Sequence, residues 1–311
     1  MKSTATPPAP AAPKAPPSQM DLQRPPMVQS ALDRSHLLNT RQIAEFVAKG
    51  FLRFDELVPR ELCDALMREL NDGLYQGYET EGARWDEVWP EPLAAGRIFR
   101  TPAVAGVIES LIGPHPRYDH HSPHLRTGPD IGHQGLHQDA EIDPRPGGFD
   151  IQISLFPHDV TPEMGGTLFV PGSHFRRVHE SEIGRYQNIR GQEQTVCKAG
   201  TIVFWHTDLW HAGRANRTDQ KRYMFKLRLN PMVRQYRLWN CDDLHDPEVL
   251  ADVAKTLKAK EPWFGQQHRL EIMNRVRLWR EVTGMEELDI NMYWTRTGNA
   301  PHGGYRQVGS A

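Results

Sequence analysis

Apolar residues in the first third of the chain recur with the spacing of amphipathic helices. Apolar side chains at i, i+3, i+4 and i+8 predict a helix from Thr40 that stops at Gly50. A second helix with one apolar stripe is expected over residues 60–74. The apolar positions are Ile43, Phe46, Val47 and Phe51 in the first helix, and Leu62, Leu66 and Leu70 in the second.

A third helix is predicted to begin at Thr101. The hydroxyl group of Thr101 can cap this helix, and Pro102 takes the first helical position, where proline is well tolerated. Gly113 is expected to end it. The three helices are amphipathic, so each needs another layer of structure against which to bury its apolar face.

Between residues 117 and 230 the pattern changes to short runs rich in β-branched and aromatic residues. Gly, Pro, Asn and Asp separate these runs, and no helical pattern intervenes. The runs are residues 117–127, 149–159, 166–172, 193–200, 201–208 and 222–230. Evenly spaced short strands predict a mainly β fold with flanking helices (α+β), on a jelly-roll or double-stranded β-helix core like that of cupins.

Helical periodicity returns after Pro231. Asp246 followed by Pro247 predicts a helix start, and this helix is expected to run to about residue 258. A longer helix is expected over residues 266–283. Its broad apolar face would contain Leu270, Ile272, Met273, Val276 and Trp279. Residues 236–311 are therefore interpreted as a helical extension that packs on the core or makes a subunit contact.

Residues 1–28 have a different composition from the rest of the chain. They are rich in Pro and Ala and lack apolar periodicity, so they cannot bury enough apolar surface to offset the entropy of ordering. We expect a disordered tail, and its sequence lacks the apolar region of a secretory signal. The β domain with its N-terminal helices is then expected over residues 29–235.

The composition bears on three questions: whether the protein binds nucleic acid, whether it spans a membrane, and in which redox compartment it lies. A net charge of -2 and a pI near 6.7 give no sign of a nucleic-acid partner. No apolar run approaches the roughly 18 residues that a membrane span needs. Cys63, Cys197 and Cys241 are far apart and form no CxxC motif, so we interpret them as reduced thiols of a cytoplasmic protein. Both a monomer and a homodimer remain open.

The candidate chemistry starts with a His-x-Asp pair. On a β-strand, side chains at i and i+2 point to the same face, so His137 and Asp139 can bind one ion while Gln138 points away. His211, on a distant strand, would complete a set of two histidines and one carboxylate. Such a set leaves half of the coordination sphere open, as non-haem Fe(II) oxygenases require.

A second His-x-Asp pair, His206 and Asp208, is the competing candidate. Strands, a Gly-rich turn and then His211 follow the first pair, and an arginine, Arg222, comes eleven residues after His211. The histidines beyond His211 lie in predicted helix or loop, with no strand arginine behind them. They are His245, His268 and His302. The order of elements therefore favours the first pair.

Arg222 is the candidate anchor for a dicarboxylate cosubstrate. A cosubstrate that chelates iron through its 2-oxoacid end needs its far carboxylate held, and guanidinium offers a two-pronged donor for this. A surface ion pair is the alternative role for Arg222. Arg126 and Thr127 precede the iron motif on a predicted strand, where they would either bind cosubstrate or substrate carboxylate or be structural.

Other polar and aromatic positions have simpler explanations. Gly165 and Gly166 are expected to form a tight turn, and residues 171–174, which include His174, another. Four histidines cluster near the expected mouth of the barrel, and we interpret them as solvated loop residues. They are His120, His121, His124 and His133. Trp205 and Trp210 flank His211, and core packing explains both.

Four motifs together resemble the phytanoyl-CoA dioxygenase family of Fe(II)- and 2-oxoglutarate-dependent oxygenases. They are LHQD at residues 136–139, GGTLFVPGSH at 165–174, the H-x-G-x-x-N run that begins at His211, and Arg222. Residues 42–66 are also similar to the opening helix, strand and helix of the family. The likeness spans about residues 38 to 231, so the N-terminal tail and the C-terminal extension lie outside it.

The resemblance implies a double-stranded β-helix core with His137, Asp139 and His211 as iron ligands, and Arg222 on the 2-oxoglutarate carboxylate. It implies O₂ as cosubstrate, release of succinate and CO₂, and hydroxylation or another oxidation of an unactivated C–H bond in a small molecule. Related halogenases replace the carboxylate ligand with a small residue, so Asp139 favours hydroxylation. The substrate is expected to be a metabolite or a natural-product intermediate.

Two other functions are compatible with the same residues. A cupin-like binding protein on the same barrel would bind a metal or ligand without turnover. A zinc hydrolase can also use two histidines and a carboxylate, but it would need a general base and would have no use for Arg222. Replacing Arg222 with alanine would separate a hydrolase from an oxygenase.

Overall fold

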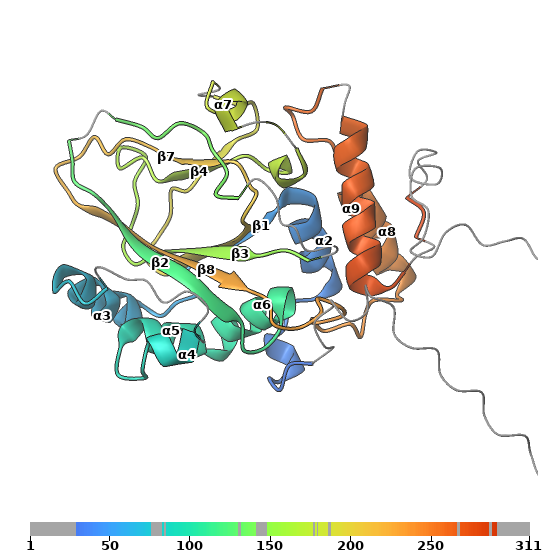
Figure 1. Cartoon of the computed structure of the whole chain (residues 1–311), viewed down its shortest axis with the longest axis horizontal. Helices are drawn as coiled ribbons and strands as arrows, with labels where there is room; N and C mark the ends of the chain where they lie inside the picture. The colour runs from blue at the N-terminus through green and yellow to red at the C-terminus, as the bar shows by residue number, and fades with distance from the viewer. Residues whose placement is uncertain are drawn as a thin grey trace, which may run out of the picture.

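The computed structural model describes residues 29–75, 83, 85–129, 132–140, 148–176, 178, 180–185, 188–265, 268–285 and 288–290. The predicted tail at residues 1–28 lies outside the described residues. Antiparallel strands form two sheets, and Figure 1 shows helices around them. The strands are β1 (Phe51–Phe54), β2 (Arg117–Arg126), β3 (Ile151–Phe156), β4 (Thr167–Phe169), β5 (Glu193–Gln194), β6 (Thr201–His206), β7 (His211–Gly213) and β8 (Arg222–Asn230).

The larger sheet has the strand order β1-β6-β3-β8-β2, and the smaller sheet has the order β5-β4-β7. Side chains of both sheets line one cavity, so the sheets face each other across it. This arrangement fits the predicted jelly-roll core. The run predicted at residues 193–200 forms only a two-residue strand, followed by an isolated bridge between Val160 and Cys197.

Strand β8 shows how the sequence sorts side chains between the cavity and the outer core. Arg222, Met224 and Lys226 line the cavity. The alternating residues Tyr223 and Phe225 belong to the outer hydrophobic core, which the helices complete. This two-residue alternation is the geometry of any β-strand. It places three polar or polarisable side chains on one inward face.

The helices cover the outer side of the larger sheet and one end of the barrel. They are α2 (Thr40–Lys49), α3 (Arg60–Asn71), α4 (Trp85–Val88), α5 (Ala94–Arg100), α6 (Pro102–Ile112), α7 (Glu180–Ile183), α8 (Pro247–Leu257) and α9 (His268–Thr283), with short 3-10 turns η1 (Arg34–His36) and η2 (Ser173–Phe175). Figure 1 shows α3 to α6 below β2 and β8, and α2 next to α8 and α9. Buried residues of α2, α8 and α9 join the same hydrophobic core as β3 and β8.

The predicted helix boundaries hold at some ends and fail at others. Asn39 caps α2 through a capping box with Gln42, and Gly50 ends α2 in the left-handed conformation with φ of 83°. Helix α3 ends at Asn71, before the predicted residue 74. The predicted cap by Thr101 is wrong, because its hydroxyl donates to the carbonyl oxygen of Ile98 in the preceding helix.

The long C-terminal helix differs from its prediction at one apolar position. Ile272, Val276 and Trp279 are fully buried, as the apolar stripe predicts, whereas Leu270 is exposed. The same helix also buries a charge, because Arg275 is fully buried beside Glu261, at 3.7 Å between Nη2 and Oε1. Among the described helices, none has the length and apolar character needed to cross a membrane.

The N-terminus of α8 supports a prediction about stability. The Asp246 side chain accepts hydrogen bonds from the backbone N–H groups of Glu248 and Val249, as a helix cap does. Asp246→Ala is expected to lower the free energy of unfolding by about 1 kcal/mol. Asp252→Ala, in the same helix, removes only an exposed ion pair with Arg41 and should cost less than about 0.5 kcal/mol. Urea denaturation of both variants checks this, and equal losses would contradict the capping role.

Candidate functional site

His137 and Asp139 lie on an irregular extended segment, residues 132–140, that runs beside β7. The prediction of a β-strand here is wrong: the segment makes one isolated antiparallel bridge, between His137 and His211. The two backbones exchange hydrogen bonds of 3.0 and 2.9 Å at this bridge. The bridge brings together a histidine from the loop and a histidine from the first position of β7, although 74 residues separate them.

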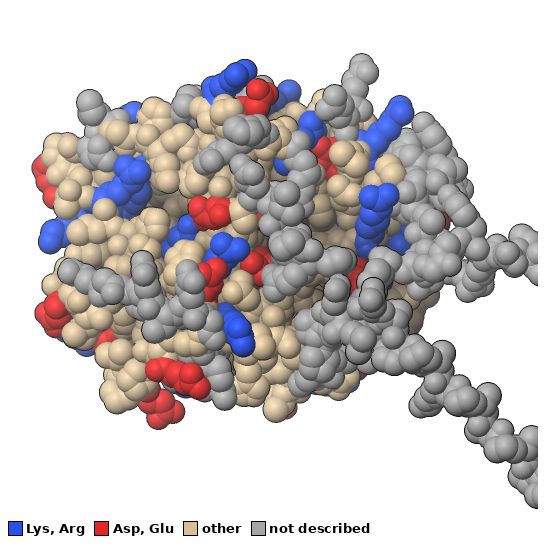
Figure 2. Space-filling view, in the orientation of Figure 1, with Lys and Arg blue, Asp and Glu red and all other residues tan. Residues whose placement is uncertain are grey.

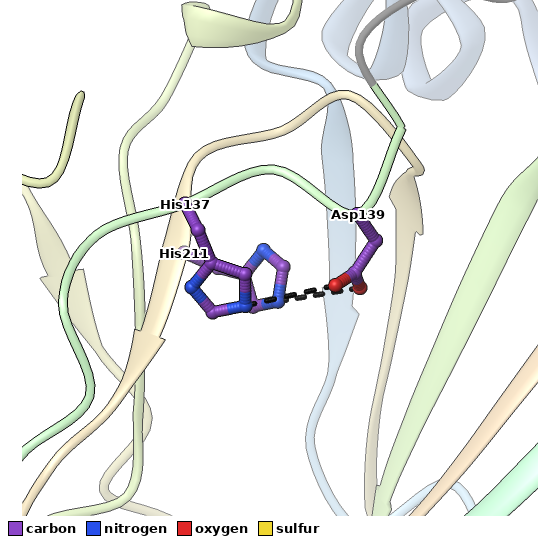
Figure 3. A group of neighbouring side chains, drawn as sticks. All are labelled: His137, Asp139 and His211. Atoms are coloured by element: carbon purple, nitrogen blue, oxygen red, sulfur yellow. Dashed lines mark ion pairs between the residues drawn. The ribbon is translucent and has the colours of Figure 1, made fainter. Parts of the chain in front are cut away.

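The side chains of His137, Asp139 and His211 converge on one point (Figure 3). The Nε2 atom of His137 is 3.6 Å from Oδ1 of Asp139, and Nε2 of His211 is 3.4 Å from Oδ2. The imidazole ring centroids are 4.2 Å apart. One atom from each residue lies within 4.8 Å of the other two, so the three groups are close enough to hold one metal ion.

Backbone carbonyl groups fix the orientation of both imidazole rings. Nδ1 of His137 lies 2.9 Å from the carbonyl oxygen of Gly135, and Nδ1 of His211 lies 3.0 Å from that of Leu209. A carbonyl oxygen accepts a hydrogen bond only from a nitrogen that carries a proton, so each ring is protonated at Nδ1, and the lone pair of Nε2 is directed toward the point that it shares with the Asp139 carboxylate. Outer contacts of this kind are typical of metal-binding histidines.

Electrostatics keeps the donors in the protonation states that a metal needs. Burial opposes ionisation of Asp139, but His211 in its protonated form, the ammonium charge of Lys226 and the hydrogen bonds from Lys226 and Gln152 lower the pKa of Asp139 well below its usual value. Burial also lowers the pKa of His211, which Asp139 offsets only in part. The site therefore holds a carboxylate and a neutral imidazole, the forms that bind metal ions.

A cavity of about 850 Å³ opens beside the three donors. Its lining includes every site residue that the sequence predicts: His137, Asp139, His211, Arg222, Arg126 and Thr127. Arg222 is buried, and its Nη1 donates to the carbonyl oxygens of Met164 and Arg214, at 2.9 Å for Arg214. Arg126 lies nearer solvent and donates from Nη1 to the carbonyl oxygen of Gly132 at 3.1 Å.

Comparison with known families identifies the class of this site. The profile of the family described as Phytanoyl-CoA dioxygenase (PhyH) matches residues 46–224, more than half of the chain. The chain belongs to this family. Membership confirms the predicted enzyme class, the Fe(II)- and 2-oxoglutarate-dependent dioxygenases, and the donor set of the site fits iron. Among curated proteins, a sequence comparison finds no significant match.

Solved structures share the fold of this phytanoyl-CoA dioxygenase family member. EctD from S. alaskensis has a TM-score of 0.50 in two structures, an apoform and one with 2-oxoglutarate and 5-hydroxyectoine. Their identities are 20% and 18%, and the match covers 67% of this chain and 83% and 82% of theirs. SnoK is a non-heme alpha ketoglutarate dependent carbocyclase from nogalamycin biosynthesis, and it has a TM-score of 0.50 at 17% identity. The match covers 65% of this chain and 87% of SnoK. At these identities the likeness is one of fold, and it confirms the predicted α+β class.

The competing His-x-Asp pair lies outside the cavity of this family member. His206 and Asp208 are buried and are not among the residues that line the cavity. Nδ1 of His206 accepts the backbone N–H of Asp208 at 3.1 Å, and its ring stacks on Phe149. Both residues are therefore explained by local packing. His174, expected in a turn, lies in η2 and is buried next to His206.

The interpretation of the upstream histidines as solvated loop residues is partly wrong. His120, His121 and His124 lie on strand β2, and His121 is buried among aromatic rings that include Trp89 and Phe225. Burial lowers the pKa of His121 to about 4, so this ring is a neutral core residue. His124 and His133 line the cavity.

Two residues next to Asp139 escaped the sequence reasoning. Gln152 of β3 donates to Oδ2 of Asp139 at 2.7 Å, and the Lys226 ammonium contacts the same oxygen. Burial lowers the pKa of Lys226, although Asp139 acts in the opposite direction. The available signal was the alternation along β8, since Lys226 follows Arg222 at i+4 and so shares its inward face.

Proposed function

We propose that this dioxygenase hydroxylates, or otherwise oxidises, an unactivated C–H bond of a small molecule, with release of succinate and CO₂. His137, Asp139 and His211 would hold Fe(II), which with bound 2-oxoglutarate supplies the O₂ activation that the reaction requires. The observation that carries the proposal is the convergence of two Nε2 atoms and one carboxylate at the wall of a cavity. The carboxylate of Asp139 occupies the position that halogenases leave to a halide, so oxidation is favoured over halogenation.

The protein contributes orientation and exclusion of water at this site. The carbonyl oxygens of Gly135 and Leu209 hold the two imidazole rings before any metal binds, which lowers the cost of ordering the ligands. Trp205 packs against His211 with ring centroids 4.4 Å apart and closes the inner wall of the cavity. A preorganised and partly apolar wall favours reaction on the substrate over side reactions with water.

Anaerobic titration with Fe(II) and then 2-oxoglutarate tests the proposed function. Chelation of Fe(II) by the 2-oxoacid produces a weak visible charge-transfer absorption, which we expect in the wild-type protein. Release of succinate in the presence of O₂ and a substrate would follow. Bound iron without this absorption would reject the oxygenase assignment and favour a cupin-like binding protein on the same barrel.

Arg222 is proposed to bind the far carboxylate of 2-oxoglutarate, with Arg126 and Thr127 closer to the cavity mouth. Arg222→Ala is expected to raise the 2-oxoglutarate concentration for half-saturation by roughly tenfold to a hundredfold, the value of a lost charge-assisted pair. Arg222→Lys should raise this concentration less than Arg222→Ala does, because lysine offers a point charge in place of a planar fork. Titration of the charge-transfer absorption measures both variants.

A matched control uses an exposed arginine. Arg185 pairs only loosely with Glu182, at 3.6 Å, and lies on the surface. Arg185→Ala should leave the 2-oxoglutarate titration unchanged. A zinc hydrolase with the same three ligands would keep its activity in Arg222→Ala and would need no 2-oxoglutarate, so this variant separates the two functions.

We also infer a reducing, cytoplasmic location. Cys63, Cys197 and Cys241 are free thiols. Burial raises the pKa of each thiol to about 11, so they are poor nucleophiles and poor partners for oxidation. Mass spectrometry of protein isolated under thiol-blocking conditions tests this inference, and a disulfide among the three would contradict it.

A further inference from the structure

Lys226 is a buried cation at the inner end of the cavity. Its side chain is 9% exposed, and its ammonium group contacts Oδ2 of Asp139 and lies 5.2 Å from the ring centroid of Trp205. Burying an ammonium group is costly unless an anion compensates it. Asp139 is that anion, and Trp205 adds a weaker cation–π contact.

Metal binding would change this balance. A carboxylate that coordinates a dication shares its charge with the metal, so Asp139 becomes a weaker partner for Lys226. The dication also repels the ammonium group, which lies against one of the proposed ligands. Lys226 then requires a second anion, and the cavity it lines is where that anion can enter.

The charges around the cavity also favour an anionic ligand. Among the described residues that line it, three are cations and one is a carboxylate: Arg126, Arg222, Lys226 and Asp139. Fe(II) and 2-oxoglutarate carry equal and opposite charges, so binding both leaves the positive excess unchanged. On the surface that Figure 2 shows, basic and acidic side chains are interspersed. The whole chain has a net charge of -2, so the positive excess of the cavity is local.

We propose that Lys226 binds a carboxylate or similar anionic oxygen group of the substrate, and that the enzyme therefore acts on small organic acids. This inference rests on the proposed oxygenase function and names its substrate class. Arg222 is held by two backbone carbonyl groups and is assigned to 2-oxoglutarate. Arg126 is more exposed than Arg222, and its Nη1 donates to the carbonyl oxygen of Gly132. Lys226 forms an ion pair with Asp139, a proposed metal ligand, so it lies where a substrate must be held.

The rest of the cavity wall suits the carbon part of such an acid. Met224 lies between Arg222 and Lys226 on the inward face of β8, and Trp205 closes the inner wall. Leu125 adds an exposed apolar side chain on the β2 side. An anionic group at Lys226 with an aliphatic body along these side chains would satisfy both the charge and the apolar surface.

Matched pairs of small ligands test the proposal on the anaerobic protein loaded with Fe(II) and 2-oxoglutarate. Aliphatic monocarboxylates from acetate to octanoate are compared with the primary amides of the same length, by calorimetric titration and by their perturbation of the charge-transfer absorption. At least one acid should bind roughly tenfold to a hundredfold more tightly than its amide, the value of a charge-assisted contact.

Three variants decide the role of Lys226. Lys226→Met should abolish the preference for acid over amide while the Fe(II)–2-oxoglutarate absorption persists, and Lys226→Arg should retain the preference. Lys198→Met, which removes an exposed lysine paired with Asp159, should behave as the wild type. Calorimetry and the absorption both report binding, so no turnover is needed.

The remaining outcomes overturn the proposal in distinguishable ways. If no acid binds better than its amide, the substrate class is wrong. A preference that survives in Lys226→Met means that the acid is held by the metal or by Arg126, and not by Lys226. Loss of iron or 2-oxoglutarate binding in Lys226→Met means that the lysine only positions Asp139 or binds the cosubstrate. Absence of the absorption in the wild type rejects the oxygenase function itself.

Discussion

His211→Ala is expected to abolish formation of the Fe(II)–2-oxoglutarate complex and turnover. His211 is the most buried of the three donors, with a side chain 6% exposed, and Leu209 fixes its ring so that Nε2 faces Asp139. Removal leaves two donors, His137 and Asp139, on one irregular segment. Loss of an outer-shell partner alone costs roughly tenfold to a hundredfold in metal affinity, so loss of a ligand should exceed about a hundredfold.

Anaerobic Fe(II) titration with the charge-transfer absorption as readout measures this loss. His206→Ala tests the competing His-x-Asp pair, because His206 is equally buried but does not line the cavity. His245→Ala is the matched surface control. We expect the absorption to persist in both. Loss in His206→Ala with the fold intact by circular dichroism would move the metal site to the second pair.

Local chemistry explains why the sequence predicted most elements. Asp246 with Pro247 marks a helix start through hydrogen bonds within three residues, and the structure has that helix at Pro247–Leu257. Gly50 needs a left-handed conformation to end its helix. Thr101 failed as a cap for an equally local reason, because helix α5, which was not predicted, offers the carbonyl oxygen of Ile98. The signal of α5 was weak because it has only seven residues, including Gly96.

The contacts between distant segments could be predicted only in part. The spacing of LHQD and His211 indicated a site, but the bridge that aligns them depends on how residues 132–140 lie beside β7. The prediction that His137 and Asp139 share a face at i and i+2 assumed a strand there, and the structure has a loop in which the two side chains still face the same point. Alternation along β8 places Lys226 on the same face as Arg222, but only the pairing of β8 with β2 and β3 shows that this face lies inside the barrel. Register is a long-range property that one sequence does not specify.

Trp205→Ala is expected to lower the free energy of unfolding by about 3–5 kcal/mol, the cost of truncating a large buried aromatic side chain. Trp205 is 1% exposed and packs edge-on against Phe169, with ring centroids 5.4 Å apart. Its Nε1 donates to the hydroxyl oxygen of Ser154 at 3.1 Å. Truncation removes this hydrogen bond and opens a void. Since small domains have roughly 5–15 kcal/mol of stability, the loss is a large fraction of the total.

Trp205→Phe separates the packing effect from the hydrogen bond. Phenylalanine keeps most of the ring and loses the donor to Ser154, so we expect a loss of about 1–2 kcal/mol. Urea denaturation of both variants measures the difference. A loss below about 1 kcal/mol in Trp205→Ala would show that the barrel collapses around the void or never packs on this ring.

The same variants test whether core packing positions the metal ligands. Trp205 contacts His211, with ring centroids 4.4 Å apart, and lies beside the ammonium group of Lys226. If Trp205 fixes His211, then Fe(II) should stabilise Trp205→Ala less than it stabilises Trp205→Phe, because the alanine variant must order the imidazole when it binds. Binding to the folded state adds stability according to affinity, so the denaturation midpoint with and without Fe(II) reports the difference. Equal stabilisation by Fe(II) would mean that the Leu209 carbonyl alone holds the ligand.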